Sequence, residues 1–244
     1  MSKKVVVING SYRRENTFNV LTQIEAILNK NGIETEILNL GDYSINACNG
    51  CDSNCIKGAR CCQTDDDMQK IREKILKCDG LILGSPVYMC GVTSRFKAFA
   101  DRTNSWFHKP ETAGIPVLHV ATTASTGLKE TVAFMQSLAT GFGARQGGAV
   151  VRAGKAMRTP VTEAEAAKFL KLINSDKSNY KPSMNEIVLF QVQKTLASKS
   201  DGSDSKFFKD RGLDKAYYHY KCKMNPLKKG LARMMAKILA KAMG

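Results

Sequence analysis

The chain has 244 residues, of which 43% are hydrophobic, and its 37 basic and 22 acidic side chains give a net charge of +15. This length suits one large domain, or one domain with an appendage. No apolar run approaches the roughly 20 residues of a membrane-spanning helix, and the short apolar run after Lys3 and Lys4 is unlike a signal peptide. We therefore expect a cytoplasmic protein. Most of the positive net charge belongs to residues 151–244, which hold 20 basic and 8 acidic side chains. Residues 1–150 hold 17 basic and 14 acidic side chains.

The first predicted element is a buried strand over residues 5–8, in which every residue is β-branched. The turn at residues 9–11 follows, and a helix with apolar spacing is predicted over residues 18–28. A strand, a polar turn and a helix N-terminus together present unpaired N–H groups and the positive end of a helix dipole. We therefore expect an anion site here. Its side-chain donors would be Ser11, Asn16, Thr17 and either Arg13 or Arg14.

The predicted anion loop lacks both common phosphate motifs, GxxxxGK[ST] and GxGxxG. This argues against an ATPase and against an ordinary dinucleotide-binding start. A phosphate monoester such as that of FMN fits the loop better. The alternative is a plain connection between a strand and a helix, in which Ser11 and Asn16 only cap the helix.

Strands and helices alternate as far as residue 152. Strands are predicted over residues 33–40, 80–84, 117–122 and 147–152, and helices over residues 66–77, 92–107 and 127–138. Alternation at this spacing implies a five-stranded parallel sheet with helices on both faces, an α/β fold. Ligands of such sheets bind at the carboxyl ends of the strands. In this chain those ends lie in residues 10–17, 84–91 and 122–127.

Two further loops at this sheet edge suit a planar ring. In the segment SPVYMCG, residues 85–91, the stretch from Pro86 to Tyr88 offers backbone groups and one aromatic face, and Gly91 allows close approach of the backbone. The segment ATTASTG, residues 121–127, is rich in hydroxyl groups. One phosphate loop and two ring loops together suit FMN. Taken singly, each loop is also compatible with an ordinary connection in an α/β fold.

These motifs resemble those of the flavodoxin-like NAD(P)H-dependent FMN reductases. NGSYRRENT looks like the family's phosphate loop, although one residue shorter, and residues 85–102 closely match its second flavin loop. The likeness covers roughly residues 3–152. It implies a flavodoxin-like fold, bound FMN, hydride transfer from NAD(P)H to the flavin, and a homodimer or homotetramer. By position, the resemblance assigns FMN binding to Ser11, Arg13, Asn16, Thr17, Pro86, Val87, Tyr88, Gly91, Thr122, Ser125 and Gly127.

We name no catalytic side chain, because flavin N5 carries the hydride chemistry in such enzymes. The leading prediction is an FMN-dependent oxidoreductase that passes electrons to a small acceptor: a quinone, a nitro compound, a flavin or an iron complex. The alternative is an electron carrier between protein partners. His119, inside a predicted strand, is expected to be a core residue, and Cys78 and Cys90 are expected to be buried thiols.

A loop over residues 41–65 holds five of the eight cysteines, and Asp66-Asp67-Met68 follows it. It resembles the cysteine-rich insertion of the family's iron–sulfur flavoprotein-like branch. Closely spaced thiolates can hold a [4Fe–4S] cluster, and the candidate ligands are Cys48, Cys51, Cys55 and Cys61. The gap between the second and third of these is one residue wider than in the branch. A zinc site, a disulfide-forming loop and an empty loop are the alternatives.

Beyond the α/β domain, which we place at residues 1–155, residues 156–244 are predicted to form a basic helical extension. Helices are expected over residues 160–174, with Thr162 and Glu165 as a capping box, over 183–198 and over 224–244, with a break at 200–205.

The last helix is amphipathic and basic, which is typical of contact with an anionic membrane. We prefer the alternative, in which its apolar side (Leu227, Leu231, Met234, Met235, Ile238 and Ala242) packs on the domain or on a second subunit. Nucleic-acid binding is not expected, because aromatic residues are absent from this stretch.

Overall fold

A computed structural model describes residues 2–51, 55 and 61–242. Within these residues, five strands form one parallel sheet in the order β2-β1-β3-β4-β5. The strands are β1 (Lys3–Asn9), β2 (Ile33–Asn39), β3 (Gly80–Pro86), β4 (Pro116–Thr123) and β5 (Arg145–Ala153). This is the flavodoxin-like order, with its switch point between β1 and β3. The predicted five-stranded α/β fold is confirmed, with strand ends that differ from the prediction by at most two residues.

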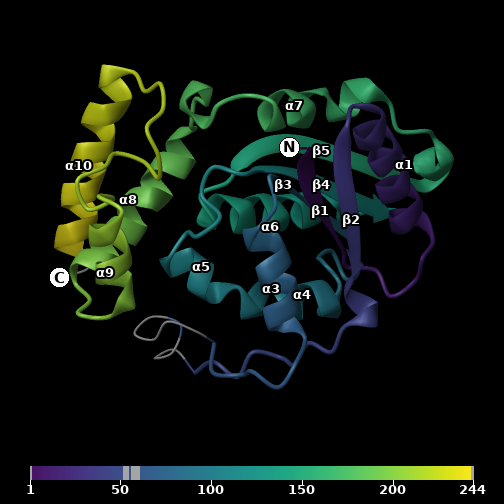
Figure 1. The fold of residues 1–244 in the computed structure, drawn as a ribbon, viewed down its shortest axis with the longest axis horizontal. Helices are drawn as coiled ribbons and strands as arrows, with labels where there is room; N and C mark the ends of the chain where they lie inside the picture. The colour runs from purple at the N-terminus through teal and green to yellow at the C-terminus, as the bar shows by residue number, and fades with distance from the viewer. Residues whose placement is uncertain (1, 52–54, 56–60, 243–244) are drawn as a thin grey trace.

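Helices cover both faces of the sheet (Figure 1). Val5 and Val7 of β1 pack on one face with α1 (Asn16–Lys30) and α7 (Glu163–Ile173). Val6 and Ile8 pack on the other face, which is covered by α3 (Met68–Leu76), α4 (Ser94–Arg102), α5 (Asn104–His108) and α6 (Leu128–Gly141). All four β1 side chains are completely buried, as expected for a β-branched central strand.

The prediction of a single helix over residues 92–107 is wrong. The chain forms α4 and α5 instead, and the break lies at Thr103. There the Thr103 hydroxyl and N–H both donate to the carbonyl of Ala100, at 2.6 and 3.1 Å. This tightened turn ends α4, and Trp106 on α5 is then completely buried against the core.

The C-terminal helices form a core of their own beside the sheet (Figure 1). They are α8 (Met184–Ser198), α9 (Ser203–Asp210) and α10 (Pro226–Ala242). Elsewhere along the chain, short 3₁₀ turns lie at Leu40–Asp42, Gly154–Arg158 and Lys177–Asn179. The predicted helix over 183–198 and the capping box of α7 are confirmed. The sequence reasoning missed α9, a short helix that begins at Ser203, inside the predicted break at 200–205. Although α7 lies beyond residue 155, Phe169 and Ile173 pack it into the core of the sheet.

Polar contacts made by Gln193 and Lys109 help to attach this helical cluster to the α/β part. The Gln193 side chain donates to the carbonyls of Phe107 and Gly141, at 2.6 and 2.8 Å. The buried ammonium of Lys109 reaches Asp204 of α9 at 3.1 Å. Throughout the described ranges, no helix is long and apolar enough to span a membrane.

Candidate flavin site and cysteine loop

A hollow of about 180 Å³ lies at the carboxyl edge of the sheet, where the loops after β1, β3 and β4 meet. Its walls are Ser11, Arg13, Glu15, Asn16, Thr17, Pro86, Val87, Tyr88, Thr122, Thr123, Ala124 and Met157. Eight of the eleven side chains predicted to bind FMN are therefore gathered around one space. Gly91, Ser125 and Gly127 lie outside its lining. Glu15 and Met157 were missed, and no signal in the sequence pointed to Met157, which follows β5.

The first turn of α1 leaves its N–H groups open toward this hollow. In the part of the chain that the structure describes, no side chain caps α1, and its first turn holds no acidic residue. The preceding turn is stabilised separately, because Ser11 N donates to Asn9 Oδ1 and Arg13 N donates to Ser11 Oγ, both at 3.1 Å. An uncapped helix of 15 residues with hydroxyl groups beside it is a site for an anion.

The structure separates the two arginines that the sequence left as alternatives. Arg13 lines the hollow, with one guanidinium nitrogen 3.6 Å from Glu15. Arg14 points elsewhere and pairs with Asp42 at 2.7 Å. Arg13 is therefore the arginine available to an anion in the hollow.

The loop after β3 makes a tight turn beside the hollow. Tyr88 N donates to Gly91 O and Gly91 N donates to Tyr88 O, at 2.9 and 3.0 Å. Between them, Met89 and Cys90 have φ angles of 48° and 59°, in the left-handed region that side chains other than glycine rarely adopt. The turn leaves Tyr88 partly exposed and both Met89 and Cys90 exposed. The prediction of a buried Cys90 is wrong for this reason, whereas Cys78 and His119 are buried as expected.

Thr93 and Gly127 bring the three loops together. Thr93 caps α4, donates to the carbonyl of Gly10 at 2.6 Å and accepts from Phe96 N at 3.1 Å. Gly127 has a φ of 88°, and a Cβ there would lie 2.6 Å from the Val87 side chain. The third loop can therefore approach the second only with glycine at this position. Sequence reasoning identified Gly127 but missed Thr93, whose partner is 83 residues away.

The cysteine loop is held by one buried side chain, Arg102 at the end of α4. Its guanidinium makes two contacts with the Asp66 carboxylate, and both side chains are only 1% exposed. It also donates to the carbonyls of Asn46 and Gln63, at 3.1 and 3.0 Å, and reaches Cys61 Sγ at 3.3 Å. Burial alone would raise the pKa of Asp66, but the hydrogen bonds outweigh it and the pKa is lowered.

The four candidate cluster ligands all belong to the described part of the cysteine loop. Burial raises the pKa of Cys55, and the neighbouring charges of Cys51, Cys61 and Cys48 raise it further. Lys109 donates to the Cys55 carbonyl at 2.8 Å, and the sulfurs of Cys51 and Cys62 are 3.0 Å apart. No disulfide joins any of the described cysteines. No group of three or more potential metal ligands is assembled among the residues described, and residues 52–54 and 56–60 of this loop lie outside them.

Comparison with known proteins decides the family. The model of the NADPH-dependent FMN reductase family matches residues 3–157. The chain belongs to this family. The match covers the sheet, the three loops and the hollow, so the predicted family and its flavodoxin-like fold are confirmed.

Several relatives in this family are iron–sulfur flavoproteins. One from Archaeoglobus fulgidus is 40% identical over 100 residues, 41% of this chain and 48% of the relative. One from Methanocaldococcus jannaschii is 41% identical over 102 residues, 41% and 51% of the two chains. The chain thus spans about half the length of these two relatives. One from Clostridioides difficile is 27% identical over 196 residues, 79% and 86% of the chains.

Solved structures show the same fold. A structure of RosB with bound 8-demethyl-8-formylriboflavin-5'-phosphate has a TM-score of 0.56 and 13% identity, and the match covers 92% of each chain. The apo form of an NADH:FMN oxidoreductase has a TM-score of 0.51 and 17% identity, over 71% of this chain and 87% of that one.

Proposed function

We propose that this protein is an FMN-dependent oxidoreductase that takes hydride from NAD(P)H and passes electrons to a small acceptor, such as a quinone, a nitro compound, a flavin or an iron complex. The observation that carries the proposal is the convergence of three loops on one hollow at the β1–β3 switch point. Flavins and nucleotides bind at such points in doubly wound sheets. Membership of the FMN reductase family supports the same conclusion.

The residues around the hollow fit FMN. The open N-terminus of α1, the hydroxyls of Ser11 and Thr17 and the Arg13 guanidinium would hold the phosphate. The hollow is smaller than the roughly 300–1,000 Å³ usual for a site that holds a complete ligand. The flavin ring of FMN would therefore extend out of the hollow, along the wall from Pro86 to Tyr88. When bound, FMN supplies the hydride-accepting centre. The polypeptide binds and orients it, and we assign no side chain as an acid or base.

The test is an anaerobic titration of the FMN-saturated protein while the visible absorbance of the flavin is followed. The oxidoreductase function predicts that NADPH or NADH alone bleaches the flavin on the time scale of a rapid-mixing measurement. If neither nicotinamide bleaches it and a reduced ferredoxin does, the protein is an electron carrier between protein partners instead. That second function is worth testing because the gathered thiols of the cysteine loop offer a place for an electron relay.

We further propose that Cys48, Cys51, Cys55 and Cys61 hold a [4Fe–4S] cluster. Relatives that are iron–sulfur flavoproteins support this, as does the placement of Cys61 beside the buried Arg102 that anchors the loop. Protein purified without air should contain about four irons per chain. Cys55→Ser should lose most of that iron, whereas Cys222→Ser, in the C-terminal helical cluster, should keep it. Zinc in place of iron, or equal iron in both variants, would contradict the cluster.

We also propose a homodimer or homotetramer, supported by the exposed Tyr88 and Met89 beside the hollow. An apolar, partly strained turn at a binding site is a plausible face for a second subunit. Sedimentation velocity of the FMN-saturated protein tests this directly. A monomer at micromolar concentration would contradict it.

We last propose that the protein is cytoplasmic and that it contacts an anionic membrane through α10. The apolar side does not pack on the domain at Leu227, Met234 and Ile238, which are 70, 52 and 54% exposed, and Ala232 on another side of the helix is buried instead. The other half of the preferred expectation, packing on a second subunit, stays a prediction. Lys237 and Lys241 flank the exposed stripe, and no acidic residue follows Asp214. Two such helices from different copies would repel each other, so an anionic surface is the better partner.

Co-sedimentation with phosphatidylserine vesicles at low salt tests the membrane contact. The full chain should bind them and not phosphatidylcholine vesicles, because the attraction is electrostatic. Replacing Leu227 and Ile238 by glutamine should release the protein. Leu196→Gln, which changes an exposed leucine of α8, should not. Binding that survives the loss of both apolar side chains would contradict a role for the stripe.

A further inference from the structure

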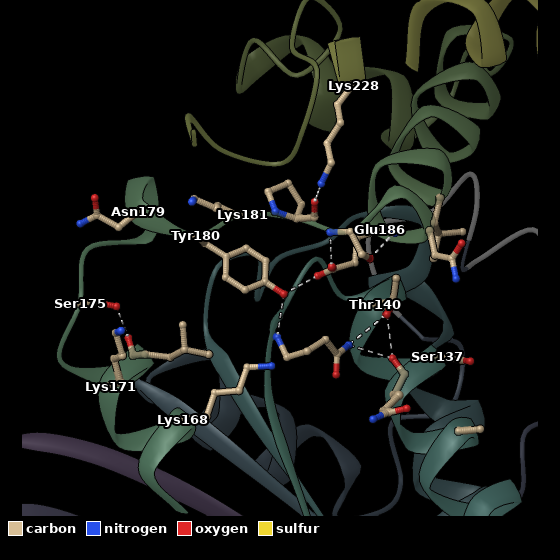
Figure 2. A pocket seen from close by; sticks show the side chains of 18 of the residues that line it. Ser137, Thr140, Lys168, Lys171, Ser175, Asn179, Tyr180, Lys181, Glu186 and Lys228 are labelled. Carbon is tan, nitrogen blue, oxygen red and sulfur yellow. Dashed lines mark hydrogen bonds between the residues drawn. The ribbon is translucent and has the colours of Figure 1, made fainter. Parts of the chain in front are cut away.

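A large groove of about 1110 Å³ lies away from the flavin hollow, at the junction of the α/β part and the C-terminal helices (Figure 2). Residues of α6, of the end of α7 and of the beginning of α8 form its walls, and Lys228 of α10 reaches it from above. Gln146, the second residue of β5, lies on its floor. Because the strands are parallel, this is the amino edge of the sheet, opposite the edge that carries the flavin loops.

The groove is positively charged and lacks compensating acids. Lys168, Lys171 and Lys181 line it and make no ion pair in the described part of the chain. Lys228 donates to the carbonyl of Pro182 at 2.9 Å, which leaves its charge uncompensated. Figure 2 shows Lys168 pointing into the space below Tyr180.

The one carboxylate in the lining, Glu186, is used within the protein. It is buried, accepts from the Tyr180 hydroxyl at 2.8 Å through Oε1, and accepts from Ser183 N at 2.8 Å through Oε2. It therefore stabilises the start of α8 as part of a capping box. No ion pair joins Glu186 to a lysine in the described part of the chain, and four lysines against this one carboxylate leave the groove with a net positive charge.

The floor of the groove is built by long-range hydrogen bonds. The Gln146 amide donates to Thr140 Oγ1 at 3.0 Å, and its oxygen contacts His119 Nε2 at 2.8 Å. Gln146 N donates to the Tyr180 hydroxyl at 3.1 Å. These contacts join β4, β5, α6 and the connection before α8, so the groove exists before any ligand arrives. A preformed site avoids part of the ordering cost of binding.

We infer that this groove binds a small phosphorylated organic molecule with at least two negative charges, of the size of a nucleotide. Ammonium groups bind phosphate as point charges, and four of them around one space favour more than one anionic group. Phe107, Leu172 and Leu189 supply an apolar wall for the organic part. The volume of the groove slightly exceeds the range usual for small-molecule sites, about 300–1,000 Å³. The site is separate from the flavin site and does not rest on the proposed reaction.

Isothermal titration of FMN-saturated protein with ADP tests the inference, with adenosine as the uncharged probe. Saturation with FMN keeps ADP out of the phosphate loop of the flavin site. ADP should bind once per chain, and adenosine should bind at least about tenfold more weakly. The double variant K171E/K181E should weaken ADP binding by about tenfold or more. Its matched control is K206E/K209E on α9, which makes the same change of net charge outside the groove and should bind ADP normally.

Three results would overturn the inference. The first is the absence of ADP binding to the unaltered protein. The second is equal weakening by the two double variants, which would mean that overall charge and not the groove attracts ADP. The third is unchanged ADP binding by K171E/K181E, which would place ADP outside the groove. K171E/K181E should still show flavin bleaching by NADPH, so failure here is distinguishable from failure of the proposed reaction.

Discussion

Replacing Arg102 by leucine is expected to lower the free energy of unfolding by about 3–5 kcal/mol, because it leaves the Asp66 carboxylate buried without its charged partner. The change also removes the donors to the carbonyls of Asn46 and Gln63, so the cysteine loop loses its anchor on α4. Chemical denaturation monitored by the fluorescence of the single tryptophan measures the loss. Iron content, measured on the same sample, should fall together with the anchoring of the loop.

Two controls make this result specific to the buried pair. Lys97→Leu breaks an exposed pair with Asp101 on the same helix and should cost only about 0.3–0.5 kcal/mol. The double variant that replaces both Arg102 and Asp66 by leucine should be more stable than the single Arg102 variant, because no unpaired charge stays buried. Equal costs for Arg102→Leu and Lys97→Leu would show that the buried pair is not what holds the loop.

Replacing Ser11 by aspartate is expected to weaken FMN binding by about 100-fold, since it places a negative charge beside the phosphate at the open end of α1. Asp can still accept the hydrogen bond that Ser11 Oγ accepts from Arg13 N, so the turn should keep its shape. Riboflavin lacks the phosphate, and its affinity should be nearly unchanged. Fluorescence titration of the apoprotein with each flavin measures both affinities.

The control for this variant is Thr22→Asp, which adds the same charge further along α1, outside the lining of the hollow. It should bind FMN normally. Equal losses for FMN and riboflavin would show that the substitution disturbs the loop itself. Normal FMN binding by Ser11→Asp would place the phosphate elsewhere and would contradict the site.

Local pattern by itself determined the architecture of this protein. The β-branched run from Val5 to Ile8 predicted a central strand because only a strand covered on both faces buries every side chain. The regular alternation of strands and helices predicted the parallel sheet and the edge at which its loops gather. Eight predicted FMN-binding residues consequently lie around one hollow. Backbone geometry and burial periodicity are properties of short segments, which is why sequence alone was sufficient for them.

Only the tertiary structure decided which side chains meet. The choice between Arg13 and Arg14 depends on Asp42, which lies far along the chain, and the role of Arg102 depends on where Asn46 and Asp66 lie in the fold. The exposed side of α10 was mispredicted because amphipathic spacing identifies an apolar face but not what covers it. The lysine groove likewise assembles side chains from α7, α10 and the connection before α8. Such contacts are set by packing between distant segments, and no local pattern encodes them.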